Sequence, residues 1–230
     1  TVATDGHAGI REMALAARQH GLKYLAITDH SQHLTIAHGL DSNRLLKQID
    51  EIDRLNDELG GIILLKGIEV DILADGSLDL PDKVLSRLDL VIGAVHNQFH
   101  LTRVKQTERI LRAMDRPCFT LLAHPSGRLL QKREAYDVDM ARIIEQARAR
   151  GCFLELNSQP QRLDLDEYYC RMARDEGVMV SINSDAHAEQ NFEFLQYGID
   201  QARRGWLEKA DVLNTLPLRE LRARLRSTMR

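Results

Sequence analysis

Long apolar runs are missing from this sequence: none approaches the roughly 20 residues that a helix needs to cross a bilayer. The first residues, TVATDGHAGI, also lack the basic leader and apolar segment of a signal peptide. Cysteine is scarce, and Cys118, Cys152 and Cys170 are too widely spaced for a disulfide framework, which favours buried thiols in a reducing compartment. We therefore expect a cytoplasmic protein that has no membrane partner.

Charge of one sign is not in large excess, because the net charge is only −3. A strong nucleic-acid binder carries a basic surface, so any affinity for DNA must come from a local patch or from another part of a longer protein. No linker rich in Gly, Ser or Pro divides the 230 residues. We therefore predict a single domain over residues 1–230, a length that suits one α/β barrel.

Short apolar runs alternate with longer segments of helical period. The predicted strands are residues 23–28, 61–70, 88–95, 119–123, 152–156 and 178–183. The predicted helices are residues 10–20, a segment capped by Asp41 or Ser42, residues 104–114, a segment opening at Asp137 or Asp139, another opening at Asp164 or Asp166, and a tail helix from Pro217. Strands that are apolar on both faces and alternate with helices predict a parallel α/β fold, and the uniform alternation favours a barrel.

Polar side chains follow the predicted strands one after another. They are Asp29 and His30, Glu69, His96, His124, Asn157, and Asp185 with His187. Because the carboxyl ends of parallel strands form the functional face of an α/β barrel, we expect these side chains to lie close together.

A single histidine after a strand is more often a hydrogen-bonded loop residue than a ligand, and a lone Glu69 could pair with Lys66. Burying several carboxylates and imidazoles together without a cation would be costly, so the recurrence favours a metal site. Imidazole and carboxylate ligands suit Zn²⁺, Mn²⁺ or Fe²⁺ better than Mg²⁺ or Ca²⁺, and Glu69 could bridge two ions. Paired ions of this kind serve in phosphoester hydrolysis.

Arg128 follows His124 closely and could hold a phosphate with two hydrogen bonds. His33 and His38 are weaker candidates for a cleft lining. The arginines of the tail helix fit the solvated face of a helix better than a DNA contact.

Five segments resemble the motifs of the PHP (polymerase and histidinol phosphatase) domain, in the same order along the chain. They are ITDH at 27–30, GIEVDIL at 67–73, AVH at 94–96, AHPSGRLL at 123–130 and NSDAH at 183–187. The segments DGSLDLPD at 75–82, LELNSQP at 154–160 and ARRGWLEKADVLNT at 202–215 are most similar to the PHP domain at the carboxyl end of bacterial family X DNA polymerases.

The resemblance implies a distorted (βα)7 TIM-like barrel with up to three divalent ions, Mn²⁺ or Zn²⁺ with Fe²⁺ as a further candidate. The implied metal ligands are Asp5, His30, Glu69, His96, His124, Asp185 and His187. The implied catalytic set is Glu69, His124 and Asp185, to which we add Arg128. The family's first strand ends in His-x-His upstream of the position of Asp5, and this strand has no counterpart here. We accordingly expect a fragment of a longer protein, with six strands instead of seven.

The resemblance also implies a function in DNA repair. The leading hypothesis is a metal-dependent 3′–5′ exonuclease or DNA end-processing module, whose partners are DNA 3′ ends and an N-terminal polymerase domain in the parent protein. A second hypothesis is a phosphomonoesterase of small molecules, of the histidinol phosphatase type. A third is a catalytically silent module that braces a polymerase.

Overall fold

The computed structural model describes residues 1–229. The strands within this range are β1 (Tyr24–Ile27), β2 (Ile63–Lys66), β3 (Glu69–Asp71), β4 (Ile92–Ala94), β5 (Leu121–Leu122), β6 (Phe153–Asn157) and β7 (Val180–Asn183). The α-helices are α1 (Ile10–Gln19), α2 (Ser42–Glu58), α3 (Asp82–Leu85), α4 (Arg103–Met114), α5 (Met140–Arg150), α6 (Glu167–Asp175), α7 (Leu195–Arg204) and α8 (Leu218–Thr228). The 3-10 turns are η1 (Thr35–Ala37), η2 (Glu189–Phe194), η3 (Lys209–Asp211) and η4 (Leu213–Thr215).

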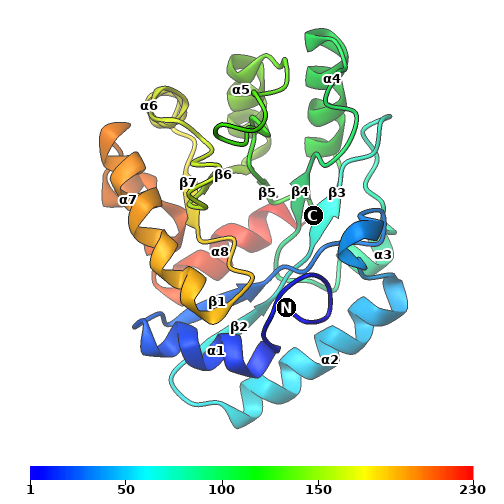
Figure 1. Ribbon diagram of the computed structural model, residues 1–230, viewed down its shortest axis with the longest axis vertical. Helices are drawn as coiled ribbons and strands as arrows, with labels where there is room; N and C mark the ends of the chain where they lie inside the picture. The colour runs from blue at the N-terminus through cyan, green and yellow to red at the C-terminus, as the bar shows by residue number, and fades with distance from the viewer. Residues whose placement is uncertain (230) are drawn as a thin grey trace.

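The strands are all parallel, as predicted for an α/β fold. One sheet pairs β1 with β2, and the other has the order β3-β4-β5-β6-β7 (Figure 1). A parallel bridge between His30 and Glu69 joins the two sheets. The strands therefore end at one common face, which is the condition for a shared site.

The predicted strand over residues 61–70 is broken into β2 and β3, which makes the prediction of one continuous strand there wrong. The break falls at Gly67, where a Cβ atom would lie 2.9 Å from the carbonyl oxygen of Ile27 and 2.9 Å from the Thr28 side chain. Because only glycine allows this close approach, the chain can turn here from its pairing with β1 to its pairing with β4.

Helix starts follow the predicted caps. The Asp41, Asp139 and Asp166 side chains accept hydrogen bonds from the backbone N–H groups of Arg44, Arg142 and Tyr169 at the starts of α2, α5 and α6. The structure adds α3 and α7, which the sequence analysis did not predict.

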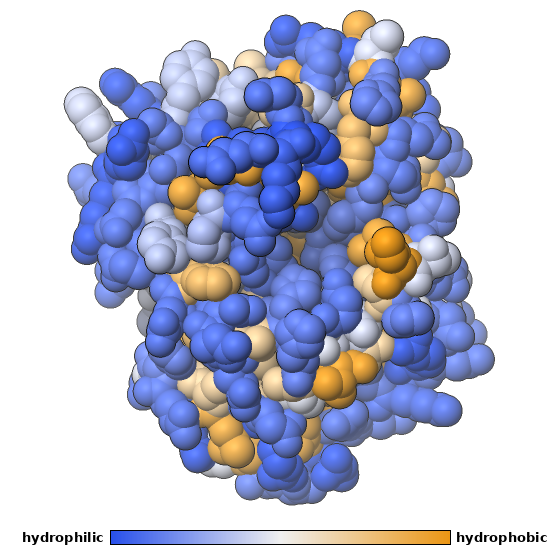
Figure 2. Space-filling model, in the orientation of Figure 1, coloured by the Kyte–Doolittle hydropathy of each residue, from blue (hydrophilic) through white to orange (hydrophobic). Residues whose placement is uncertain are grey.

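The largest core cluster packs α4, α5 and α6 against the second sheet, whereas α1 and α2 cover β1 and β2 in a separate cluster. Helix α8 lies over the amino ends of the strands, where Leu221 and Leu225 belong to a third core cluster together with Leu121 and Ile92. Figure 2 shows a mostly hydrophilic face on which apolar side chains form small separate groups. No helix of residues 1–229 is long and apolar enough to cross a membrane.

Candidate metal centre

Glu69 lies at the centre of the site, at the first position of β3. Its Oε1 atom is 3.0 Å from Nε2 of His124 and 3.2 Å from Nε2 of His96. Its Oε2 atom is 3.8 Å from Nδ1 of His30. The carboxylate is 8% exposed, so three imidazoles surround it in a setting that water hardly reaches.

A second group of side chains continues from His30. Oδ2 of Asp5 lies 3.7 Å from Nε2 of His30 and 3.6 Å from Nε2 of His187. Nδ1 of His187 is in turn 3.8 Å from Oδ1 of Asp185. The structure thus joins Asp5, His30, Asp185 and His187 to the group around Glu69 in one connected cluster.

The donor set of this cluster fits divalent metal ions. Ligand atoms of Asp5, His30 and His187 lie within 4.8 Å of one another, and so do those of His30, Glu69 and His96. Nδ1 of His30 and Nδ1 of His124 are buried without a hydrogen-bond partner among residues 1–229. Buried ring nitrogens without partners are expensive unless a cation uses them, and imidazole with carboxylate suits Zn²⁺, Mn²⁺ or Fe²⁺.

Two of the imidazoles, those of His96 and His187, favour the protonated form because carboxylates lie beside them. Burial opposes protonation of His96, but hydrogen bonds to Asp71 and Glu69 outweigh it and raise its pKa to about 9. The Asp5 carboxylate raises the pKa of His187 to about 9. His124 behaves in the opposite way, because burial and the charge of Arg162 lower its pKa to about 4. Since metal ligation needs neutral imidazoles, ion binding must displace protons here.

The backbone at two of the predicted ligands is left-handed. His124 has φ 28° and Asp185 has φ 49°. Such conformations cost about 1–3 kcal/mol for residues other than glycine and persist where the surroundings enforce them, typically at functional sites.

Two buried carboxylates of the centre were not predicted as site residues. Oδ1 of Asp71 lies 2.5 Å from Nδ1 of His96, and Asp71 is 2% exposed. Glu155 on β6 is 5% exposed, and burial together with the charges of Asp185 and Glu69 raises its pKa to about 8. Asp71 lies two positions after Glu69, and Glu155 lies two positions before Asn157, and the sequence had placed both Glu69 and Asn157 at the functional face. This period-2 spacing was the one available signal, because alternate residues of a strand face the same side.

Arg128 does not touch the cluster directly. Its guanidinium donates hydrogen bonds to the backbone carbonyls of Arg162 and Leu163, and its Nη1 atom is 3.9 Å from Asp166. Arg162, which sequence reasoning missed, lies closer: its Nε atom is 4.0 Å from Oδ2 of Asp185. Its buried Nη1 atom has no hydrogen-bond partner among the described residues. Nothing local in the sequence marks Arg162, because a contact between two loops places it.

The weaker histidine candidates lie outside the cluster. His33 and His38 are exposed on the segment after β1, and neither belongs to a group of candidate ligands in residues 1–229.

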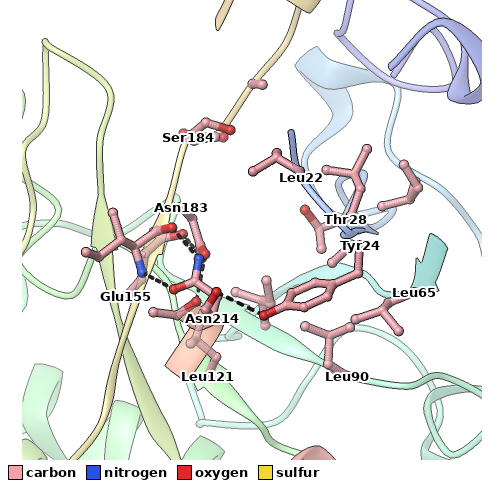
Figure 3. A pocket seen from close by; sticks show the side chains of 18 of the residues that line it. Leu22, Tyr24, Thr28, Leu65, Leu90, Leu121, Glu155, Asn183, Ser184 and Asn214 are labelled. Atoms are coloured by element: carbon pink, nitrogen blue, oxygen red, sulfur yellow. Dashed lines mark hydrogen bonds between the residues drawn. The ribbon is translucent and has the colours of Figure 1, made fainter. Parts of the chain in front are cut away.

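A cavity of about 680 Å³ opens beside the centre. Residues 24–27 of β1 line one side of it, and Ser181, Ile182 and Asn183 of β7 line another. Its wall is apolar at Leu65, Leu90 and Leu121 and polar at Glu155, Asn183 and Asn214 (Figure 3). The cavity therefore lies between β1, at the edge of the first sheet, and β7, at the edge of the second.

The chain is similar to known proteins both in sequence and in fold. A family model described as the PHP domain matches residues 1–159. The chain is 42% identical over 223 residues to the DNA polymerase/3′-5′ exonuclease PolX of Bacillus subtilis, covering 97% of this chain and 39% of that protein. It is 30% identical over 195 residues to a "probable phosphatase" of Caldanaerobacter subterraneus, covering 80% of this chain and 72% of that protein. A crystal structure of histidinol phosphate phosphatase from Lactococcus lactis, complexed with zinc, L-histidinol and phosphate, matches with a TM-score of 0.61 at 12% identity, over 90% of this chain and 92% of that one.

Proposed function

Since the chain belongs to the PHP domain family, we propose that it is a metal-dependent phosphoesterase that removes nucleotides from DNA 3′ ends, as the 3′–5′ exonuclease module of a longer polymerase protein. The observation that carries the proposal is the connected cluster of imidazoles and carboxylates around Glu69. The exonuclease named in the Bacillus subtilis relative supports DNA as the substrate, although this chain spans 39% of that protein's length.

The candidate ligands divide among up to three ions. Glu69 would bridge, with His96 and His124 on one side, and Asp5, His30 and His187 would hold another ion. Asp185 would serve a third ion together with Glu69. Bound divalent ions of this kind activate water and offset charge on a phosphoester. Mn²⁺ and Zn²⁺ suit these ligands, and Fe²⁺ is a further candidate.

The substrate phosphate would be held by Arg162. Its Nε atom lies 4.0 Å from Oδ2 of Asp185, and its buried Nη1 atom has no hydrogen-bond partner among residues 1–229, so the guanidinium keeps a donor for a phosphate oxygen at the metal centre. Arg128, predicted from the sequence to orient the substrate, would act by fixing the segment that carries Arg162, since it donates to two carbonyls there. Buried His124, with its lowered pKa, stays neutral and available as a ligand at neutral pH.

When β2 and β3 are counted as the two halves of one bent strand, the described residues hold six strands, and a further strand would complete the fold as a distorted (βα)7 barrel. Strands β1 and β7 each have one neighbour in the sheets, and the cavity of about 680 Å³ lies between them. A strand seated there would cover both edges and could bring two more ligands toward Glu69 and Asp185. The expected His-x-His strand of the family has these properties.

A small-molecule phosphomonoesterase is the second candidate. The fold shared with histidinol phosphate phosphatase and the identity to the probable phosphatase favour it. Turnover of single-stranded DNA should be compared with turnover of histidinol phosphate, in the longest natural polypeptide that contains this chain. Mn²⁺-dependent release of nucleotides from the 3′ end supports the proposal. Turnover of histidinol phosphate alone refutes it, and no hydrolysis of either would leave a silent bracing module.

A further inference from the structure

Glu155 lies inside β6 and accepts hydrogen bonds from three different strand ends. Its Oε2 atom accepts from the backbone N–H of His124 at 2.7 Å and from Nδ2 of Asn157 at 3.2 Å. Its Oε1 atom accepts from Nδ2 of Asn183 at 2.9 Å, as Figure 3 shows at the wall of the cavity. One carboxylate thus ties together the ends of β5, β6 and β7.

The two amides are fixed so that only an acceptor fits between them. The Ser181 hydroxyl donates to Oδ1 of Asn183 at 2.8 Å, and the backbone N–H of Gln159 donates to Oδ1 of Asn157 at 3.0 Å. Both amides therefore turn their NH₂ groups toward Glu155. If Glu155 were replaced by glutamine, its NH₂ group would face one of the three donors, which are the His124 N–H and the NH₂ groups of Asn157 and Asn183.

Each of the three groups that donate to Glu155 either belongs to a candidate metal ligand or lies close to one. His124 is itself a ligand candidate, and its left-handed backbone is held at the N–H by Glu155. Asn157 Nδ2 also donates to Oδ2 of Asp185 at 3.0 Å. Asn183 precedes Asp185 by two residues at the end of β7. The hydrogen bonds of Glu155 therefore set the position of two ligands on separate strands.

The charge of Glu155 acts on the same site. Within residues 1–229, no side-chain nitrogen of Lys, Arg or His lies within 4.0 Å of its carboxylate, while Glu69 and Asp185 lie near enough to repel it. An additional buried carboxylate beside Glu69 is unfavourable when no cation is bound and favourable next to divalent cations.

We propose that Glu155 is a positioning residue of the metal centre, which holds His124 and Asp185 in place and adds negative charge that strengthens cation binding. This inference rests on the proposed function only in taking the cluster as a metal centre. A purely structural role would instead affect the folding of the chain and leave its affinity for metal unchanged.

The test measures Zn²⁺ affinity by competition with a chromophoric chelator, in the whole protein, for wild type and Glu155→Gln. We expect an affinity about 10- to 100-fold lower, the usual cost of losing a residue that orients ligands. Asp89→Asn is the matched control: Asp89 is a half-buried carboxylate in the segment before β4, and it accepts a hydrogen bond from the Lys66 N–H at 2.8 Å. Its Zn²⁺ affinity should equal that of the wild type. Thermal unfolding of each metal-free variant reports its effect on the fold.

If Glu155→Gln binds Zn²⁺ within about twofold of wild type, the inference is overturned, whatever its melting temperature. Should that variant fail to fold, Glu155→Asp decides instead. It keeps the charge but shortens the reach, so we expect a loss of Zn²⁺ affinity of at least about threefold, and an unchanged affinity would refute the inference. DNA cleavage does not enter this readout. A wild type that binds Zn²⁺ but leaves DNA intact contradicts only the proposed exonuclease function.

Discussion

Replacing Asp71 by asparagine should weaken metal binding through His96. The contact between Oδ1 of Asp71 and Nδ1 of His96 measures 2.5 Å, and both side chains are largely buried, so solvent screens it little. A carboxylate in this position fixes the ring with Nε2 toward Glu69 and raises the basicity of that nitrogen. Asparagine can still accept a hydrogen bond but carries no charge.

The size of the effect follows from the charge of the lost bond. Hydrogen bonds to charged groups contribute about 1.5–3 kcal/mol, which corresponds to roughly 10- to 100-fold in an equilibrium constant. We therefore expect Asp71→Asn to lower Zn²⁺ affinity by about that factor. The pKa of His96 in the metal-free protein, about 9, should fall toward the ordinary histidine value of 6.5, although Glu69 would still keep it above that value.

Chelator competition gives the Zn²⁺ affinity, and NMR titration of the imidazole protons gives the pKa of His96. Asp50→Asn serves as the control, because Asp50 is exposed on α2 and has no cation within 4.0 Å among residues 1–229. If Asp71→Asn changes neither quantity more than the control does, Asp71 does not orient His96 and the reasoning is refuted.

Three further outcomes follow from the same centre. Arg162→Gln should raise KM for a DNA 3′ end about 10-fold or more, because a hydrogen bond from a charged group is lost. Arg203→Gln, on the exposed side of α7, is the control and should leave KM unchanged. If the two variants have the same KM, Arg162 does not bind the substrate. The pKa values of His96 and His187 are raised to about 9 in the metal-free folded state, against 6.5 in the unfolded chain, so the folded state binds more protons between these pH values. The contribution of these two histidines to folding stability is therefore complete below pH 6.5 and is lost as the pH rises through about 9. The urea midpoint of the metal-free chain should accordingly be lower at pH 9 than at pH 6.5, and a higher midpoint at pH 9 would contradict these shifts. Saturation with Zn²⁺ at 100 times its dissociation constant should stabilise the fold by about 2.7 kcal/mol, and removal by EDTA should reverse this; an unchanged melting temperature would mean that no ion binds the native state.

The strands and the candidate ligands could be predicted from the sequence because both depend on local pattern. Apolar runs mark buried parallel strands, and parallel strands end on one face, so polar residues after each run had to meet. The caps Asp41, Asp139 and Asp166 are equally local, since each acts on an N–H three residues ahead. Family resemblance added Asp5, which no strand end marks.

Other features depend on long-range contacts that local pattern does not contain. The break at Gly67 arises from the approach of residues 27 and 28, which are distant in sequence. Asp71 and Glu155 lie within strands, and their role depends on which face of the strand meets the ligands. Arg162 lies near Asp185 in a loop that Arg128 holds by donating to the backbone carbonyls of Arg162 and Leu163. The sequence did not predict helix α7, which contains Gly198. The need for glycine at this position comes from tertiary packing, because a Cβ atom there would lie 2.0 Å from the Ser158 hydroxyl oxygen.

The central claim is that metal ions bound by this cluster drive hydrolysis at DNA 3′ ends. The most direct test strips metal from the longest natural polypeptide containing this chain, adds Mn²⁺ in steps, and follows bound metal and nucleotide release from one labelled single strand. Wild type is compared with Glu69→Gln. We predict that 3′-terminal nucleotides are released in proportion to bound Mn²⁺, and that Glu69→Gln loses both metal and activity. Release that is independent of Mn²⁺, or unchanged in Glu69→Gln, would contradict the account.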